Sequence, residues 1–264
     1  MSDSVLTRAF GDLRKRGRIA LVPYLTAGYP DPRASGEALR IADELADVLE
    51  VGVPFSDPLA DGPTIQRSTH QALQQGMTLA RTFELIDRSR LRRPVVVFSY
   101  MNPILRYGLD RFLRDAESLG IAGLLLTDLP AGSDPGVERA VQRSSLDLIR
   151  LIAPTTRPER LTAAVEGAQG FVYLVARLGV TGASRSLAAD LTDSVARVRG
   201  ATGLPIAVGF GISTAEQART VARLADGVVV GSALVEALGN DGVAGAKRFL
   251  RELRAGLDPA PAVA

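Results

Sequence analysis

Short apolar runs recur along the chain, each of a length that suits one buried strand. There are eight of them, at residues 18–25, 47–53, 94–100, 123–129, 146–153, 170–176, 204–210 and 226–231. Most are apolar at nearly every position and not at alternate positions, which is typical of parallel strands that are covered on both faces. The pattern therefore predicts a parallel sheet with helices packed against it.

The stretches between these runs have the spacing of amphipathic helices, most clearly at residues 33–46, 111–120, 134–145, 157–168 and 213–224. Strand and helix thus alternate along the whole chain of 264 residues. Eight such units match a (β/α)8 TIM barrel, whereas a doubly wound open sheet usually has about five or six strands. We predict an α/β protein with a single barrel domain over residues 1–264, an N-terminal helix and a frayed tail at 258–264.

One connection is longer than the others. The second and third apolar runs begin 47 residues apart, so the loop after the second strand carries the extra segment "SDPLADGPTIQRSTHQALQQG", residues 56–76. The predicted barrel therefore has an extended second βα loop.

Two carboxylate residues lie in the second apolar run and in the extended loop that follows it. Glu50 lies inside the second apolar run and Asp61 in the loop behind it, and barrel enzymes build their active sites where strands end. Burial among Val48, Val51 and their neighbours would raise the pKa of Glu50, while a carboxylate in a wetter loop would stay ionised. Two acids with separated pKa values suit coupled proton transfers, so Glu50 and Asp61 are candidate catalytic residues.

Structural explanations of the same residues stay open at this stage. The chain has 31 Lys and Arg residues, all but two of them Arg, so a strand glutamate could simply pair with an arginine across the barrel. Asp61 in "DGP" and Asp57 in "SDP" have the sequence of ordinary turns and helix starts.

Glycine-rich turns follow the last predicted strands, at residues 179–184, 209–213 and 231–233. Backbone N–H groups at such turns and at helix N-termini bind phosphate, frequently after strands seven and eight of a barrel. No lysine lies in these turns, so charge neutralisation would fall to the N–H groups and to Arg177 or Arg185. The other explanation is that glycines only let each strand turn tightly into a helix.

Composition narrows the chemistry further. A net charge of +2 gives no reason to expect nucleic acid as a partner, and the absence of cysteine excludes thiolate chemistry and disulfides. The single histidine, His70, lies in a polar helical stretch, so no metal site is expected. Both lysines, Lys15 and Lys247, lie in end segments, which argues against a Schiff-base aldolase. With no signal peptide or membrane span in view, we expect a cytoplasmic protein.

Five segments together resemble one family, the tryptophan synthase alpha subunits. They are "PYLTAGYP" (23–30), "LEVGVPFSDPLADGPTIQ" (49–66), "SYMNPI" (99–104), "YLVARLGVTGA" (173–183) and "VGFGIS" (208–213). The resemblance implies a barrel that cleaves indole-3-glycerol phosphate to indole and glyceraldehyde 3-phosphate by a retro-aldol reaction. It also implies an alpha2beta2 complex in which indole passes to a beta subunit. The alpha chain itself would need no cofactor, because pyridoxal phosphate belongs to the beta subunit.

The resemblance also implies roles for single residues. Glu50 matches the acid–base glutamate and Asp61 the catalytic aspartate, while Thr181, on a mobile lid at 177–191, would meet Asp61 when the lid closes. Substrate-binding positions match Tyr173, the phosphate-binding Gly182, Gly209, Gly211, Gly231 and Ser232, and the indole-enclosing Tyr24, Ile65, Phe98, Leu125 and Phe210. Beta-subunit contacts match Pro54, Asp57 and Pro130.

Two positions depart from the family pattern, Ala176 in place of a serine and Thr127 before "DLP". Neither position performs the chemistry. The alternatives that remain are a different phosphosugar-handling barrel, a stand-alone lyase that releases indole without a partner, and a chain that mainly binds and activates the beta subunit.

Overall fold

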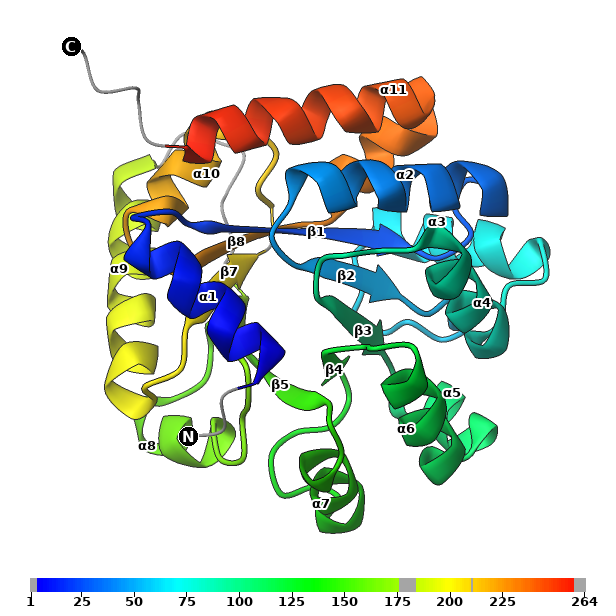
Figure 1. Cartoon of the computed structure of the whole chain (residues 1–264). Coiled ribbons are helices and arrows are strands. Elements are labelled where there is room, and N and C mark those ends of the chain that lie inside the picture. Colours follow the sequence, from blue (N-terminus) through cyan, green and yellow to red (C-terminus); the bar gives the residue numbers. More distant parts are fainter. Residues whose placement is uncertain (1–3, 176–183, 210, 259–264) are drawn as a thin grey trace.

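The computed structural model describes residues 4–175, 184–209 and 211–258, with the side chains of 184–190 left aside. Within these ranges, eight parallel strands pair in sequence order and the eighth closes on the first (Figure 1). The strands are β1 (Ala20–Thr26), β2 (Leu49–Gly52), β3 (Val95–Ser99), β4 (Gly123–Leu126), β5 (Asp147–Ile152), β6 (Val172–Val175), β7 (Ile206–Gly209) and β8 (Gly227–Val230). Each lies within or just beyond a predicted apolar run, so the predicted (β/α)8 barrel is confirmed.

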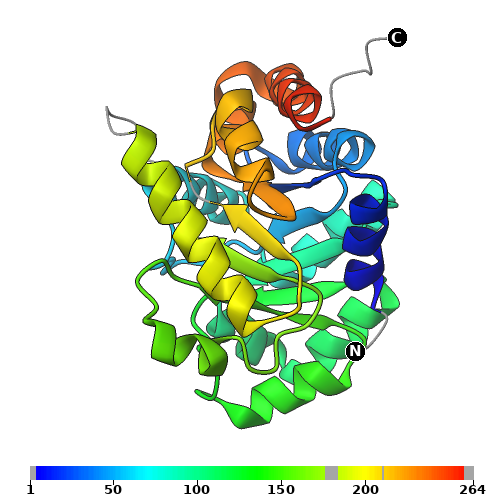
Figure 2. The same cartoon turned by 90° about the vertical axis from the view of Figure 1, so that its left-hand side faces the viewer.

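Helices surround the barrel, as the two views in Figures 1 and 2 show. They are α1 (Val5–Lys15), α2 (Pro32–Leu45), α3 (Pro63–Gln74), α4 (Leu79–Ser89), α5 (Met101–Tyr107), α6 (Leu109–Ser118), α7 (Pro135–Arg143), α8 (Pro158–Ala164), α9 (Ser184–Ala201), α10 (Ala215–Ala222) and α11 (Ser232–Leu257). The extended second loop contains a helix of its own, α3, before α4 leads to β3. His70 is exposed on α3, in agreement with its place in a polar helical stretch.

The last helix ends where the frayed tail was expected to begin. Asp258, which the sequence placed in a frayed tail, ends α11 as its C-cap residue. Its carboxylate forms ion pairs with Arg254 at 3.0 Å and with Arg18 at 3.3 Å. The side chain thus pairs with Arg254 on its own helix and with Arg18, which lies far away in the sequence.

Both faces of the strands are buried, which explains their continuous apolar character. On β1, Leu21 and Leu25 pack outward against the helices, while Ala20 and Val22 point into the barrel. Neighbouring residues of a strand face opposite sides of the sheet, so each strand contributes to an inner and an outer core.

Helix α1 covers the end of the barrel at which the strands begin. Leu6 and Phe10 are buried, and the Phe10 ring lies 5.2 Å from that of Phe171. The close fit requires glycine on the strands: a Cβ at Gly123 would lie 2.9 Å from Leu6 Cδ1, and one at Gly227 would lie 3.1 Å from Phe10. Helix α1 therefore plugs this end, and the opposite end is left for ligands.

Asp47 serves the fold and not the chemistry. Its Oδ2 atom accepts hydrogen bonds from the backbone N–H of Leu21 at 3.0 Å and from Arg254 Nη1 at 2.7 Å. The buried pair ties α11 to the starts of β1 and β2, and burial of both partners makes loss of either one costly.

Replacement of Phe10 by Ala should lower the free energy of unfolding by about 3–5 kcal/mol, because a buried ring is lost and a cavity remains. Val5, which is 49% exposed on the same helix, provides the control. Urea unfolding of Phe10→Ala and Val5→Ala measures both effects, and an equal small change in the two variants would contradict the role of α1 as a plug.

Candidate active site

Glu50 lies at the middle of β2, where its backbone pairs with Tyr24 of β1 and Val96 of β3. The side chain is 1% exposed, and its Oε1 atom has no hydrogen-bonding partner among the described residues. Burial, followed by the charge of Asp61, raises the pKa of Glu50 to about 8. No cation among the described residues contributes to this shift, so the described part of the chain gives no support to a pair with an arginine, and the carboxyl group is mostly protonated at neutral pH.

Asp61 lies in the loop between β2 and α3. The loop is held by hydrogen bonds from Asp61 N to Pro58 O at 3.1 Å and from Gln66 Nε2 to Asp61 O at 3.0 Å. Helix α3 begins after Gly62 as N-cap and has no side-chain cap, so the Asp61 carboxylate does not serve as the helix start that its sequence suggested. Its side chain is available for chemistry.

Asp61 is less exposed to water than the sequence indicated. Burial raises its pKa to about 6, and a hydrogen bond from the Tyr100 hydroxyl offsets part of that increase. The carboxylate nevertheless stays mostly ionised at pH 7, as expected. The pKa values of Glu50 and Asp61 thus lie on opposite sides of neutrality.

Tyr100 is a site residue to which the sequence assigned no role. It follows β3, is 5% exposed, and packs its ring 5.2 Å from that of Phe55. Its hydroxyl oxygen accepts a hydrogen bond from Ala60 N at 3.0 Å, directly before Asp61. The available signal was its place at the carboxyl end of a strand, within the segment "SYMNPI".

Aromatic and apolar side chains line the space beside the two carboxyl groups. Tyr24 packs edge-on against Phe98 with ring centroids 5.2 Å apart, and Ile65 of α3 belongs to the same cluster. Leu125 is fully buried in the interior cluster that Phe98 and Tyr173 cover. These predicted residues are therefore brought together in and around the barrel mouth.

Two glycines make room for the tyrosines. A Cβ at Gly52 would overlap the Tyr24 hydroxyl, and a Cβ at Gly209 would overlap that of Tyr173. Burial raises the pKa of both tyrosines well above the usual value, and the charges of Glu50 and Asp61 add to the effect. Both phenols are neutral hydrogen-bonding groups at physiological pH.

The start of α11 lies at the same end of the barrel. Gly231 is its N-cap and provides no side-chain bond, and Ser232 is exposed in the first turn. A helix start without a side-chain cap offers backbone N–H groups to an anion. Gly211, after β7, has a φ of 80°, a conformation that favours glycine. Both features suit the predicted phosphate site.

Some predicted site residues lie outside the described residues. These are Thr181, Gly182 and Phe210, together with Arg177 and Ala176, and the side chain of Arg185 is also among those left aside. The predicted lid at 177–191 is therefore described only from Ser184 onward, and only as the backbone of α9.

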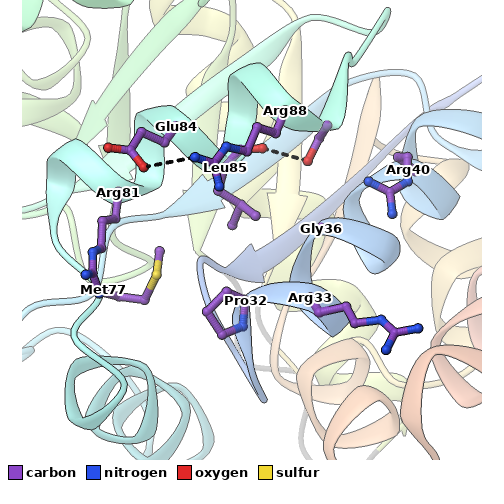
Figure 3. A pocket seen from close by; sticks show the side chains of 10 residues that line it. Pro32, Arg33, Gly36, Arg40, Met77, Arg81, Glu84, Leu85 and Arg88 are labelled. Atoms are coloured by element: carbon purple, nitrogen blue, oxygen red, sulfur yellow. Dashed lines mark hydrogen bonds and ion pairs between the residues drawn. The ribbon is translucent and has the colours of Figure 1, made fainter.

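Two surface cavities lie outside this site. One, of about 520 Å³, lies between α2 and α4, with the guanidinium groups of Arg33 and Arg81 on opposite sides of it (Figure 3). The other, of about 530 Å³, is lined by Pro54 and Phe55 of the second loop and by residues of α5. In the described part of the chain, no cluster of three or more His, Cys, Asp or Glu side chains could hold a metal ion, and no helix is long and apolar enough to cross a membrane.

A closed (β/α)8 barrel with a protonated and an ionised carboxyl group at its open end, beside an uncapped helix start, has the layout of a barrel enzyme. A family model described as tryptophan synthase alpha chain matches residues 10–256. The chain belongs to the tryptophan synthase alpha chain family. The resemblance noted from the five sequence segments is thereby confirmed.

Individual relatives agree over nearly their full lengths. The tryptophan synthase alpha chain of Chloroflexus aggregans is 44% identical over 94% of this chain and 96% of its own length, and that of Synechococcus elongatus is 44% identical over 98% of both. Among solved structures, tryptophan synthase from M. tuberculosis superposes with a TM-score of 0.90 at 41% identity, covering 98% of this chain and 100% of that one. The alpha subunit from Legionella pneumophila superposes with a TM-score of 0.88 at 32% identity, over 97% and 99%.

The pKa of Glu50 makes a prediction for stability. Since its folded-state pKa of about 8 lies above the unfolded value of 4.5, the folded state binds the proton more tightly, and stability is lost as the pH rises from about 4.5 to about 8. Glu50→Gln removes this loss and should stabilise the fold at pH 9, by on the order of 3 kcal/mol, with little effect near pH 5.

Urea unfolding at pH 5 and pH 9 measures this difference. Glu37→Gln, at an exposed position of α2, is the control and should change stability little at either pH. An equal effect of Glu50→Gln at both values would show that the buried carboxyl group is not protonated in the folded state.

Proposed function

We propose that this chain cleaves indole-3-glycerol phosphate to indole and glyceraldehyde 3-phosphate, the carbon–carbon lyase reaction of its family. The observation that carries the proposal is Glu50, a buried carboxyl group with a pKa of about 8 next to the ionised Asp61. A retro-aldol cleavage that proceeds without a Schiff base needs a group that gives one proton and takes another, and such a group works best with a pKa near neutrality.

In the proposed reaction Glu50 starts protonated and transfers its proton to the indole ring carbon that bears the glycerol chain. Asp61 stabilises the positive charge that develops at the ring nitrogen. The Glu50 carboxylate then takes the proton of the chain hydroxyl group as the carbon–carbon bond breaks. The electrons of that bond return to the indole ring, an aldehyde is released, and Glu50 is protonated again.

The surroundings suit the two ends of this substrate. The Tyr24, Phe98 and Ile65 cluster offers apolar surface for an indole ring, with Leu125 beneath it. The start of α11 at Gly231 and Ser232, with Gly209 and Gly211 nearby in the fold, offers N–H groups for the phosphate. Tyr173 would contact the substrate between these two parts, and Thr181, Gly182 and Phe210 would complete the pocket.

We further propose that a beta subunit binds where the second loop and the loop after β4 emerge. Asp57 and Pro130 are exposed there, and Leu59, in the same loop as Asp57, is 91% exposed. An exposed leucine beside these residues fits a surface that a partner covers. Indole would pass to this subunit in an alpha2beta2 complex in the cytoplasm, with pyridoxal phosphate bound by the beta subunit and no cofactor on the alpha chain.

The direct test is release of indole from indole-3-glycerol phosphate, measured with and without a beta subunit. Glu50→Gln and Asp61→Asn should each lower kcat by at least about a hundredfold, the usual weight of a general acid or base, while the fold stays intact. Cleavage by Glu50→Gln at the wild-type rate would overturn the mechanism.

The same assay distinguishes this function from that of a stand-alone lyase and from that of a chain that only activates its partner. A stand-alone lyase would be fully active without the beta subunit, and a chain that only activates its partner would retain association but show no cleavage. Binding of the beta subunit by Glu50→Gln, measured by calorimetry, provides the control for an intact partner surface.

The pKa values predict a bell-shaped dependence of kcat/KM on pH. Activity should fall below about pH 6, where Asp61 becomes protonated, and above about pH 8, where Glu50 loses its proton. Steady-state rates from pH 5 to pH 9.5 measure both limbs. A profile that rises steadily through pH 8 would contradict the role of Glu50 as the initial acid.

A further inference from the structure

Asp128, in the loop after β4 (residues 127–134), contacts an element far from it in sequence. Its Oδ1 atom accepts a hydrogen bond from Met101 N at 2.8 Å. Met101 is the first residue of α5, and the N-cap of that helix, Tyr100, makes no side-chain cap bond. Asp128 thus supplies the cap that the sequence of α5 lacks.

This cap fixes the residue that holds the catalytic loop. Tyr100 directly precedes Met101, and its hydroxyl group accepts the hydrogen bond from Ala60 N and lies against Asp61. The direction in which the Tyr100 side chain leaves the backbone depends on the peptide that joins it to Met101. A bond at Met101 N therefore limits movement of the Tyr100 hydroxyl.

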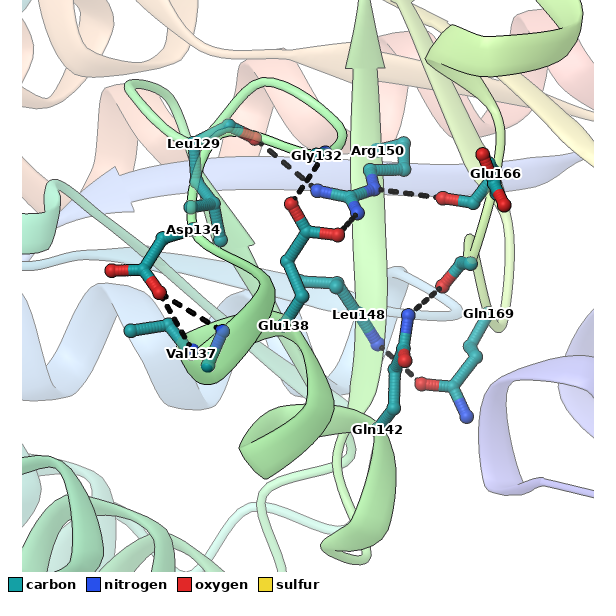
Figure 4. A network of polar contacts seen from close by, with 12 residues as sticks. Leu129, Gly132, Asp134, Val137, Glu138, Gln142, Leu148, Arg150, Glu166 and Gln169 are labelled. Atoms are coloured by element: carbon teal, nitrogen blue, oxygen red, sulfur yellow. Dashed lines mark hydrogen bonds and ion pairs between the residues drawn. The ribbon is translucent and has the colours of Figure 1, made fainter.

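The loop that carries Asp128 is itself braced by a buried ion pair, shown in Figure 4. The Nη2 atom of Arg150 on β5 lies 2.6 Å from the Oε2 atom of Glu138 on α7, and the two side chains are 3% and 12% exposed. Arg150 Nη1 donates to Leu129 O at 3.2 Å, and Glu138 Oε1 accepts from Gly132 N at 2.7 Å. The pair thus holds the loop backbone at two points on the C-terminal side of Asp128.

We propose that Asp128 is a positioning residue for Asp61: by capping α5 it holds the Tyr100 hydroxyl group against the Ala60–Asp61 segment. The proposal rests on the proposed function, because that function gives Asp61 its catalytic role. The titratable groups near Asp61 in the described structure are Glu50, Tyr24, Tyr100 and Tyr173, and the charge of Asp61 raises the pKa of each of them. Of these, Tyr100 is the one that lowers the pKa of Asp61 by hydrogen bonding.

The test is a pH titration of the isolated chain in which 13C NMR follows the carboxyl carbon of Asp61. The resonance is assigned by its absence from the spectrum of Asp61→Asn. Asp128→Ala should raise the pKa of Asp61 above its starting value of about 6, by up to about one unit, because the Tyr100 hydrogen bond is weakened. Tyr100→Phe should raise it at least as far. In the activity assay, the acid limb should shift in the same direction, with kcat lowered more than KM is raised.

Three variants separate positioning from general damage to the loop. Asp128→Asn keeps the oxygen acceptor and should restore the wild-type titration. Asp134→Ala removes the carboxylate that caps α7 from the same loop, accepting from Gly136 N and Val137 N, and should leave the Asp61 titration unchanged. Tyr100→Phe combined with Asp128→Ala should shift Asp61 no further than Tyr100→Phe alone, because both changes act on one link.

An unchanged titration in Asp128→Ala, or a shift that adds fully to that of Tyr100→Phe, would overturn the proposal. Equal shifts in Asp134→Ala and Asp128→Ala would do the same, since they would indicate nonspecific loosening. The NMR titration does not need catalysis. A wild-type chain that releases no indole would therefore refute the proposed function and still leave the link from Asp128 to Asp61 decided by the spectra.

Discussion

Burial of one uncompensated carboxyl group is the constraint on which the site depends. Glu50 is 1% exposed, and its Oε1 atom has no hydrogen-bonding partner among the described residues. A charged carboxylate in that place would be costly, so the group keeps its proton up to about pH 8. The fold gives up some stability at alkaline pH, and in return a proton donor is ready at neutrality.

The barrel meets this constraint by treating its two ends differently. At the end where the strands begin, α1 fills the opening with Leu6 and Phe10, and the Asp47–Arg254 pair joins the strands to α11. At the other end, Gly52 and Gly209 leave room for tyrosine rings where larger residues would overlap them. The contacts that stabilise the fold thus lie at the end where the strands begin, and the end where the strands finish is left open for a ligand.

Much of the architecture was predictable because it follows from local patterns. The apolar runs predicted all eight described strands, and the long second connection predicted an inserted segment, which contains α3. Glu50 could be singled out as a polar residue in an apolar strand. Tyr100 could not be assigned a role, because its function depends on a contact with Ala60, 40 residues earlier in the chain. The ion pair of Asp258 with Arg18 could not be predicted for the same reason, since Arg18 lies far away in the sequence.

The sequence by itself determined the class of fold, the family and the two carboxyl groups, because strand periodicity and motif order are properties of neighbouring residues. Only the tertiary structure decided what those groups experience. How far Glu50 and Asp61 are shielded from water depends on which side chains converge from separate strands. A pKa is set by burial and by nearby charge, and both are created by packing between distant segments.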